Sequence, residues 1–303
     1  MSHVLYEGPI VDAHQHFWDP QSNPHPWLRP EVNIPFRYGD YNPIKRRYFP
    51  EDYLADTAGH NVVQSVYIET EWEPSDPTGE TRFVTELAGV AGYPNAVVAQ
   101  AWLHHANAIE ILRAQAAFPL VRSVRHKPGG PERPEDVDKQ TTLMSDPAWR
   151  SGYDRLADVG LHFDLQTPWW NLREAARLAR DFPDTTILLN HTGLPQDRSE
   201  AGLAQWREAM ALFAQCPNVA VKISGIGVRG VPWTVQANEW IVRQVIDLFG
   251  VDRAMFASNF PVDGLCASFD TIFTGFKTIV SDLPEAAQAK LFHDNARRYY
   301  RIA

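Results

Sequence analysis

Short β-prone runs alternate with helical patterns along the whole of this sequence. The β-prone runs are residues 10–17, 62–70, 96–103, 121–127, 161–167, 185–193, 218–227 and 253–263. The segments that follow carry apolar residues at helical spacing, at 81–91, 106–118, 147–159, 172–182, 203–215, 239–249, 269–280 and 284–300. Strands that alternate with helices form a parallel sheet, and eight such strands are the number that closes a barrel. The sequence therefore predicts an α/β fold, a single-domain (β/α)8 TIM barrel over residues 1–303.

Two segments exceed what a minimal barrel needs. Residues 18–50 follow the first β-prone run and are rich in prolines, which interrupt helix and sheet, and in aromatic residues. A loop this long in a compact domain is usually functional. One interpretation is a lid over the barrel mouth, and the other is an ordered loop packed on the barrel's flank. Residues 128–139 (PGGPERPEDVDK) form a second long loop at the same end.

Composition restricts the partners of the chain. Of 303 residues, 44% are hydrophobic and 21% charged, and the net charge is −9 with no basic run. This balance argues against nucleic acid or a membrane as partner and favours a small-molecule substrate. No apolar run has the length of a membrane span, and the first nine residues lack a signal-peptide pattern, so a cytoplasmic location is expected.

The cysteines and tryptophans bear on disulfide bonds, metal binding and a possible dimer contact. Cys216 and Cys266 are the only cysteines, which excludes a disulfide framework and a cysteine metal cage. Trp233 and Trp240, interpreted as surface residues, are compatible with a homodimer.

The first β-prone run, IVDAHQHF, carries two histidines one residue apart. In a regular strand, alternate side chains share a face, so Asp12, His14 and His16 should point one way and Val11 and Ala13 the other. Two imidazoles at a strand's end can form half of a metal site or a proton-transfer pair. Two ordinary polar residues at a strand end are the alternative.

The other strands can be oriented by assuming that their aliphatic face packs against the helices. The residues then expected to face the barrel interior are Tyr67, Glu69, Gln100, Trp102, His104, Ser123, Arg125, Lys127, His162, Asp164, Gln166, Leu189, His191, Lys222, Ser224, Ala257 and Asn259. His126 is expected to face outward. Active sites of such barrels lie at the carboxyl ends of the strands. The residues predicted nearest that mouth are His16, Glu69, His104, Arg125, Gln166, His191, Lys222 and Asn259.

Five motifs now resemble a known family. They are DAHQHFW at 12–18, VRH at 124–126, NHTGLP at 190–195, VKISG at 221–225 and SNFPVD at 258–263. In this order they resemble the amidohydrolase-related proteins of the amidohydrolase superfamily. The most similar branch holds lactonases of carbohydrate and aromatic catabolism, such as fuconolactonase, rhamnonolactonase, 4-sulfomuconolactonase and 2-pyrone-4,6-dicarboxylate lactonase.

The resemblance implies a hydrolase that opens the lactone of a sugar acid or related carboxylated ring by attack of an activated water. His14, His16 and His191 would form the histidine cluster, and Arg125 would polarise the carbonyl. The family's eighth-strand aspartate, which activates the water, is replaced by Asn259. An amide cannot accept a proton at neutral pH, so the base would be Asp263, Glu69 or His16.

The same resemblance implies the substrate-binding set and leaves the cofactor open. The expected substrate contacts are Trp18, Glu69, Trp102, His104, His126, Gln166 and Lys222. Asn190 stands where the family commonly has aspartate, and Gln166 where metal-dependent relatives have histidine, so a binuclear centre is not expected. The alternatives are no metal, or one divalent ion, zinc by preference, on His14, His16 and His191. The rival functions are a metal-dependent decarboxylase and a catalytically silent barrel that binds a sugar acid.

Overall fold

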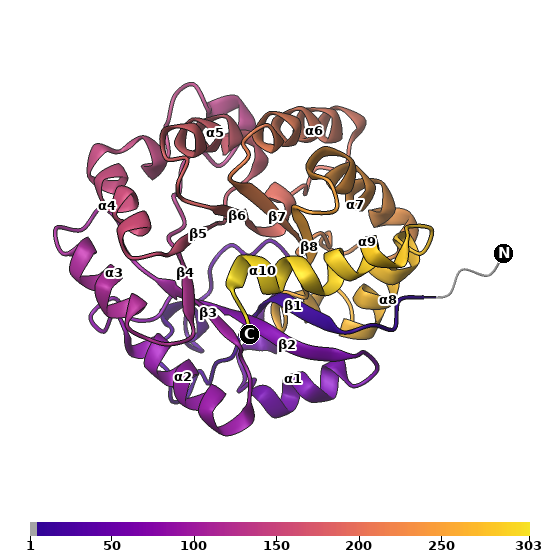
Figure 1. Cartoon of the computed structure of the whole chain (residues 1–303), viewed down its shortest axis with the longest axis horizontal. Helices are drawn as coiled ribbons and strands as arrows, with labels where there is room; N and C mark the ends of the chain where they lie inside the picture. The colour runs from indigo at the N-terminus through magenta and orange to yellow at the C-terminus, as the bar shows by residue number, and fades with distance from the viewer. Residues whose placement is uncertain (1–4) are drawn as a thin grey trace.

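The computed structural model describes residues 5–303. Of the nine N-terminal residues considered for a signal peptide, the first four therefore lie outside the described residues. Eight strands form one parallel sheet in which each strand pairs with the next along the chain. They are Ile10–Gln15 (β1), Val62–Ile68 (β2), Ala96–Gln100 (β3), Val121–Arg125 (β4), His162–Leu165 (β5), Ile187–Leu189 (β6), Val219–Ile223 (β7) and Ala254–Phe256 (β8). The His16 amide donates to the Phe260 carbonyl (2.8 Å) and the Asn259 amide to that of His14 (2.7 Å), which joins the chain after β8 to β1. The predicted (β/α)8 barrel is confirmed, with its helices outside the strands (Figure 1).

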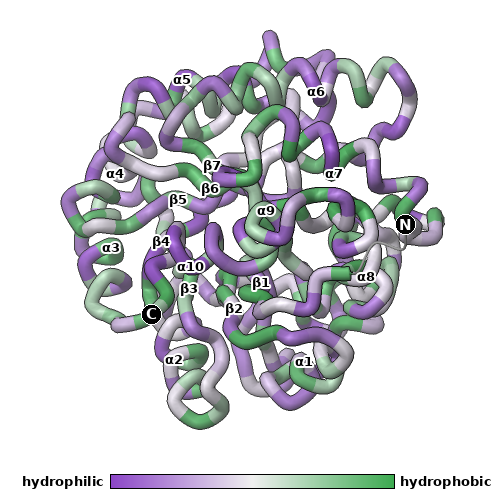
Figure 2. Tube along the Cα trace, turned by 45° about the vertical axis from the view of Figure 1, so that its right-hand side comes forward, coloured by the Kyte–Doolittle hydropathy of each residue, from purple (hydrophilic) through white to green (hydrophobic). Residues whose placement is uncertain are grey.

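The helices occupy the segments that the sequence predicts. They are Gly79–Ala91 (α2), Ala108–Ala116 (α3), Pro147–Asp158 (α4), Leu172–Asp181 (α5), Glu200–Ala214 (α6), Val235–Phe249 (α7), Phe269–Ile279 (α8), Glu285–Ala289 (α9) and Asn295–Tyr300 (α10). Hydrophobic and hydrophilic residues alternate along the outer helices (Figure 2), as packing one face on the strands requires. None of the helices within residues 5–303 is long and apolar enough to cross a membrane.

Helix α1, Pro50–Thr57, is absent from the predicted set. Its sequence nevertheless carries two start signals. Pro50 occupies the first turn, and the Asp52 carboxylate accepts a hydrogen bond from the Phe49 amide at 2.9 Å.

The alternation predicted for the first strand is wrong because β1 is bulged. Asp12 pairs with Ser65 and Gln15 with Tyr67, so three steps along β1 match two along β2. Val11 and Ala13 belong to the apolar cluster inside the barrel, while the Asp12 carboxylate accepts from the Tyr53 hydroxyl of α1 at 2.9 Å. A bulge shifts side chains to the other face of a strand. Beyond it, the histidines turn toward the barrel interior.

The orientations of the other strands are confirmed in part. Asp164, Lys222 and Ala257 are buried on the inner side, whereas Tyr67 and Leu189 pack in the outer cluster under the helices. The predictions for Tyr67 and Leu189 are wrong because the lower part of the barrel interior is also apolar. Aliphatic residues therefore occupy both the inner and the outer face of these strands, and they do not identify the outer face. The inner layer is Val11, Ala13, Val66, Ile68, Ala96, Val98, Leu188, Ala220, Met255 and Ala257.

The C-terminal helix closes the floor of the barrel. In Figure 1, α10 lies across the ring of strands. The Tyr300 hydroxyl donates to Asp164 at 2.9 Å, and Asp164 also pairs with the Lys222 ammonium at 2.6 Å. Both charges are fully buried, so each depends on the other for compensation.

An antiparallel bridge joins the two ends of residues 18–50. Trp18 and Tyr48 exchange backbone hydrogen bonds of 3.1 and 2.9 Å, and the Trp18 indole donates to the Ile44 carbonyl at 3.0 Å. Between them the chain forms two short 3₁₀ turns, Pro26–Leu28 and Asn42–Ile44. Three other aromatic side chains of this segment, Trp27, Phe36 and Tyr41, stack on one another. The segment is therefore ordered by its own aromatic packing.

The two tryptophans considered for a dimer contact differ in exposure. Trp233 is buried against Phe276, with ring centroids 5.5 Å apart, which contradicts the expectation of a surface position. Trp240 is 43% exposed on α7.

Two glycine substitutions test the packing of helices on the barrel. A Cβ at Gly152 in α4 would lie 2.0 Å from the Leu103 carbonyl oxygen, whereas one at Gly89 in α2 would meet nothing within 4 Å. We expect Gly152→Ala to lower the free energy of unfolding by about 1–3 kcal/mol or more, because the Leu103 backbone cannot move aside to relieve the clash. Gly89→Ala should raise it by about 0.5–1 kcal/mol, since a helical glycine loses more entropy on folding. Urea titration measures both, and equal effects would contradict the close packing of α4.

Candidate active site

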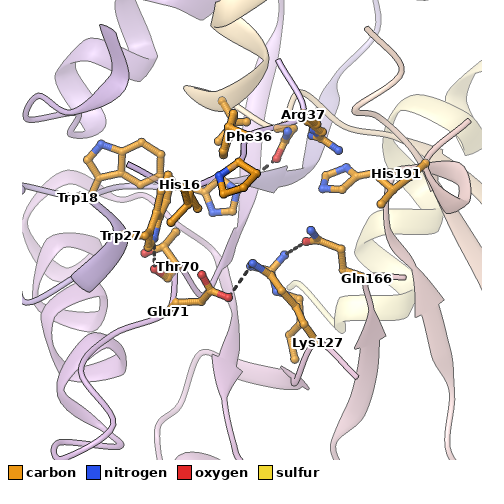
Figure 3. A pocket seen from close by; sticks show the side chains of 16 residues that line it. His16, Trp18, Trp27, Phe36, Arg37, Thr70, Glu71, Lys127, Gln166 and His191 are labelled. Atoms are coloured by element: carbon orange, nitrogen blue, oxygen red, sulfur yellow. Dashed lines mark hydrogen bonds and ion pairs between the residues drawn. The ribbon is translucent and has the colours of Figure 1, made fainter. Parts of the chain in front are cut away.

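A pocket of about 300 Å³ opens at the carboxyl ends of the strands. Figure 3 shows His16 and His191 near one another, with Phe36 and Arg37 of the 18–50 segment beside them. The lining residues are His16, Trp18, Trp27, Ile34, Pro35, Phe36, Arg37, Thr70, Glu71, Arg125, Lys127, Gln166, His191, Leu194, Asn259 and Val262. The 18–50 segment therefore forms one wall of the pocket.

Three histidines meet at the base of this pocket. The ring centroid of His14 lies 5.0 Å from that of His16 and 4.5 Å from that of His191. Both ring nitrogens of His14 are buried and have no hydrogen-bond partner among residues 5–303. The Nδ1 atoms of the other two are engaged, with the Ile68 carbonyl at 2.8 Å for His16 and with the Ser224 hydroxyl at 2.9 Å for His191.

Burial and the nearby cations favour the neutral imidazole form of all three histidines. Burial and, to a smaller extent, the neighbouring Arg125 lower the pKa of His16 to about 3. Burial also holds the pKa of His14 and of His191 well below the usual range, and nearby cationic side chains act in the same direction. Because a carbonyl only accepts, Nδ1 of His16 carries the proton and its Nε2 is unprotonated.

His191 reaches the pocket through a strained turn. β6 ends at Leu189, and His191, Thr192 and Leu194 all have positive φ values, of 55°, 50° and 58°. Such conformations cost energy outside glycine and concentrate at functional sites. A Cβ at Gly225, which itself has a φ of 61°, would lie 2.7 Å from the His191 ring. The glycine after β7 therefore leaves space for the imidazole.

Arg125 is anchored by three partners. Its Nε donates to the Glu69 carboxylate at 2.5 Å, one terminal nitrogen donates to the Glu69 carbonyl, and the other to Gln166 Oε1 at 2.7 Å. The side chains of Arg125 and Glu69 are only 3% and 2% exposed. A guanidinium has five N–H donors, so two remain for a ligand in the pocket. Glu69 itself does not line the pocket.

Asn259 stands between a histidine and a carboxylate. Its φ is 56°, its Oδ1 lies 3.2 Å from His16 Nε2, and its amide nitrogen donates to Asp263 at 2.6 Å. Since His16 Nε2 is unprotonated, two acceptors face each other across the 3.2 Å gap. A water molecule that donates to both would satisfy them.

Asp263 is fully occupied by its neighbours. It accepts hydrogen bonds from Tyr38 (3.0 Å), the Gly225 amide (3.0 Å) and Asn259, and pairs with Arg37 at 3.4 Å. Burial raises the pKa of Asp263. Its carboxylate fastens the 18–50 segment to the chain after β8 and does not line the pocket.

Lys222 lies below the pocket. Burial lowers the pKa of Lys222 to about 8, while Asp164 opposes the shift. The ammonium lies 5.0 Å from the centre of the Tyr300 ring. Lys222 is not among the lining residues, so it supports the floor of the site.

Five of the seven predicted substrate contacts lie outside the pocket lining: Glu69 and Lys222, described above, and Trp102, His104 and His126. β3 ends at Gln100, and Trp102 and His104 follow in a turn where strand alternation no longer applies, so the predicted inward orientation is wrong for both. His104 is exposed, and Trp102 stacks on His105. His126 accepts from the Trp149 indole at 2.9 Å on the outer side of β4, where alternation places it. Trp18 and Gln166 do line the pocket.

Several lining residues were not selected as site residues from the sequence, among them Trp27, Arg37, Glu71 and Leu194. Trp27 and Arg37 belong to the 18–50 segment, whose aromatic content was the only signal for them. Glu71 pairs with Lys127 at 2.8 Å, and Leu194 follows the His191 turn. Strand alternation identifies none of these, because all four lie in loops.

The donor types, but not their arrangement, suit a metal ion. Neutral imidazoles are common zinc ligands. Among residues 5–303, however, no group of three or more His, Cys, Asp or Glu side chains is arranged to hold a metal. Asp263 and Glu69, the carboxylates nearest to Asn259 and Arg125, are bound to other side chains, and the cations that lower the pKa of His14 would also repel a dication. As placed, these side chains do not form a metal site.

The side chains that line the pocket include more cations than carboxylates, although each cation is paired with a carboxylate in or beside the lining. Arg37, Arg125 and Lys127 face the pocket, with Glu71 as the only carboxylate among the lining residues. Neutral histidines add no charge. The site therefore favours an anionic ligand or a reaction in which negative charge develops.

Comparison with known proteins agrees with the motifs. The amidohydrolase family model matches residues 11–302. A protein of Sinorhizobium fredii designated y4mH is 39% identical over 97% of this chain and 98% of its own length. An L-fucono-1,5-lactonase of Burkholderia ambifaria is 29% identical over 96% of this chain and 95% of its own. A crystal structure of an amidohydrolase from Burkholderia multivorans with bound zinc superposes with a TM-score of 0.81 at 23% identity, covering 98% of this chain and 100% of the other. The chain belongs to the amidohydrolase family.

Proposed function

We propose that this protein is a lactonase, a carboxylic-ester hydrolase that opens the lactone ring of a sugar acid in carbohydrate catabolism. The observation that carries the proposal is the arrangement around Asn259. The His16 Nε2 atom and the Asn259 amide oxygen lie 3.2 Å apart, next to the Arg125 guanidinium, which has spare donors. The similarity to an L-fucono-1,5-lactonase supports the same class of substrate.

The nucleophile is a water held by His16 and Asn259. His16 Nε2 takes one proton as the water oxygen bonds to the lactone carbonyl carbon, and Asn259 Oδ1 orients the second hydrogen. The low pKa of His16 keeps Nε2 free of protons in the resting site, and the developing negative charge beside it raises its basicity. When the tetrahedral intermediate collapses, the ring C–O bond breaks. The imidazolium returns the proton to the leaving alkoxide, giving a hydroxy acid.

Arg125 stabilises the oxyanion. Its position is fixed by Glu69 and Gln166, so little reorganisation is needed when charge develops. Lys127 and Arg37 add positive potential that suits the carboxylate product. Trp27, which packs perpendicular to the buried Trp18, provides an apolar face for the ring.

Two alternatives belong to other chemistries. A decarboxylase of this superfamily is expected to use an eighth-strand aspartate as a metal ligand, which Asn259 does not supply. A barrel that only binds a sugar acid would have no use for a bare imidazole beside the carbonyl-polarising arginine. A metal-dependent version of the lactonase would rest on His14, His16 and His191.

The class of reaction is tested by a proton-release assay on chelator-treated protein. The substrates are sugar 1,4- and 1,5-lactones, among them L-fucono-1,5-lactone, with pyrone dicarboxylates as a second group. We expect hydrolysis of at least one sugar lactone without added metal, because no step above uses one. Activity that returns only with zinc or manganese would contradict the metal-free route, and silence under both conditions would reject the lactonase.

Replacement of Arg125 tests its role at the carbonyl. Arg125→Met should raise KM and lower kcat by about 10²–10³, the usual loss when an oxyanion donor is removed. Because the substitution also strips Glu69 of its partner, Arg125→Met/Glu69→Gln serves as the control for an uncompensated buried charge. Unchanged kinetics in both variants would remove Arg125 from the mechanism.

Restoring the family's carboxylate tests the role of the amide. In Asn259→Asp a second carboxylate would face Asp263, with loss of the 2.6 Å hydrogen bond. We expect a loss of about 1–3 kcal/mol in stability at pH 7, less at acidic pH where one carboxyl is protonated, together with lower kcat/KM. Asn259→Asp/Asp263→Asn, which restores one carboxylate and one amide, should recover the stability. A large gain in lactonase activity by the single variant would instead identify a lapsed enzyme.

A further inference from the structure

A second cavity of about 470 Å³ adjoins the active-site pocket. It is bounded by the loops that follow β4, β5 and β6, so it lies at the same mouth of the barrel. Lys127, Gln166 and Leu194 line both cavities. We call this second cavity, with its wall of Trp169 and Trp170, the annex.

One wall of the annex is aromatic and fixed. The indole rings of Trp169 and Trp170 are perpendicular, with centroids 5.5 Å apart. The Trp170 N–H donates to the Pro131 carbonyl at 2.8 Å, which ties the loop after β5 to the loop after β4. An indole held in this way offers a ring face at low cost in conformational entropy.

The remaining walls are polar. Gln205 of α6 is exposed and lines the annex together with Gln196. The Asp197 carboxylate, whose pKa is lowered by hydrogen bonds from Ser199, is a further acceptor there. Amide and carboxylate groups opposite an aromatic wall match a pyranose ring, which has an apolar C–H face and a rim of hydroxyl groups.

Gln166 connects the two cavities. Its Oε1 accepts from Arg125 on the active-site side, which leaves its amide hydrogens to donate to a ligand. Leu194 at the same junction holds a positive φ of 58°, a conformation disfavoured for leucine. At the shared boundary, Gln166 is therefore positioned by Arg125 of the active-site pocket.

We infer that the pocket and the annex form one bipartite substrate site. The pocket takes the lactone ring and the annex takes a second pyranose, so the preferred substrate class is the lactone of a disaccharide acid, an aldobionolactone. Alone, the pocket of about 300 Å³ lies at the lower limit of small-molecule sites, roughly 300–1,000 Å³. An aryl substituent would use the indoles but leave the polar side chains without partners. This inference rests on the proposed lactonase function.

The test compares matched substrates that share one lactone ring. Glucono-1,5-lactone is assayed beside cellobiono-1,5-lactone and lactobiono-1,5-lactone, with spontaneous hydrolysis subtracted. We expect kcat/KM for at least one disaccharide lactone to exceed that for the monosaccharide by about tenfold, a gain of the size of one stacked ring.

Three variants locate the effect. Trp170→Ala removes the aromatic wall, and Gln205→Trp fills the annex from an exposed position without touching the core. Both should lower the ratio of disaccharide to monosaccharide kcat/KM toward one. Trp240→Ala, at a 43% exposed tryptophan of α7 that lines neither cavity, is the matched control and should leave the ratio unchanged.

The outcomes separate the two proposals. If glucono-1,5-lactone is hydrolysed and neither disaccharide lactone is preferred, the annex proposal is overturned while the lactonase stands. If no lactone is hydrolysed, the lactonase fails, and calorimetry with lactobionate decides the annex. Binding that Trp170→Ala weakens and Trp240→Ala does not would support the second sugar site, and no binding would reject it.

Discussion

The buried carboxylate of Asp12 is the contact on which the site depends. It accepts the Ser258 amide at 2.8 Å, the Ser258 hydroxyl at 2.6 Å and the Tyr53 hydroxyl at 2.9 Å. These bonds join β1, the chain after β8 and helix α1 at the seam where the barrel closes. Burial raises the pKa of Asp12 to about 6, and the same three hydrogen bonds oppose the shift. Because His14 also donates its amide to Asp12, the seam fixes the bulge that turns both first-strand histidines inward.

Pairing of charges away from the solvent arranges the rest of the site. Arg125 and Glu69, Lys222 and Asp164, and Arg37 and Asp263 are three ion pairs at the upper barrel and its floor. Each carboxylate is occupied, so none is left as a free base facing the substrate. The imidazoles consequently carry the unpaired polar atoms. In the proposed lactonase mechanism, this division places proton transfer on neutral groups and charge stabilisation on the cations.

The fold was accessible from the sequence because its signals are local. Alternating β-prone and helical segments set the order of elements, and the positions of Arg125, Gln166 and Asn259 follow from strand alternation. Beyond the regular strands, side chains no longer alternate between two faces, and their orientation cannot be predicted in this way. The bulge before His14, the positive φ of His191 and the turn that carries Trp102 away from the pocket depend on contacts between distant segments. The conformation of residues 18–50 likewise arises from aromatic packing that no local pattern specifies.

At position 259, an amide in place of the family's carboxylate changes both the charge and the hydrogen bonds of the site. An aspartate here would add a negative charge beside Asp263, whereas the amide donates to that carboxylate and keeps its own oxygen toward His16. With one formal charge removed, the cations that line the pocket outnumber the single carboxylate of Glu71. A dication would increase that excess, while an oxyanion and the carboxylate product reduce it. In the proposed lactonase mechanism, the neutral residue on the eighth strand thus leaves the substrate to supply the negative charge that these cations stabilise.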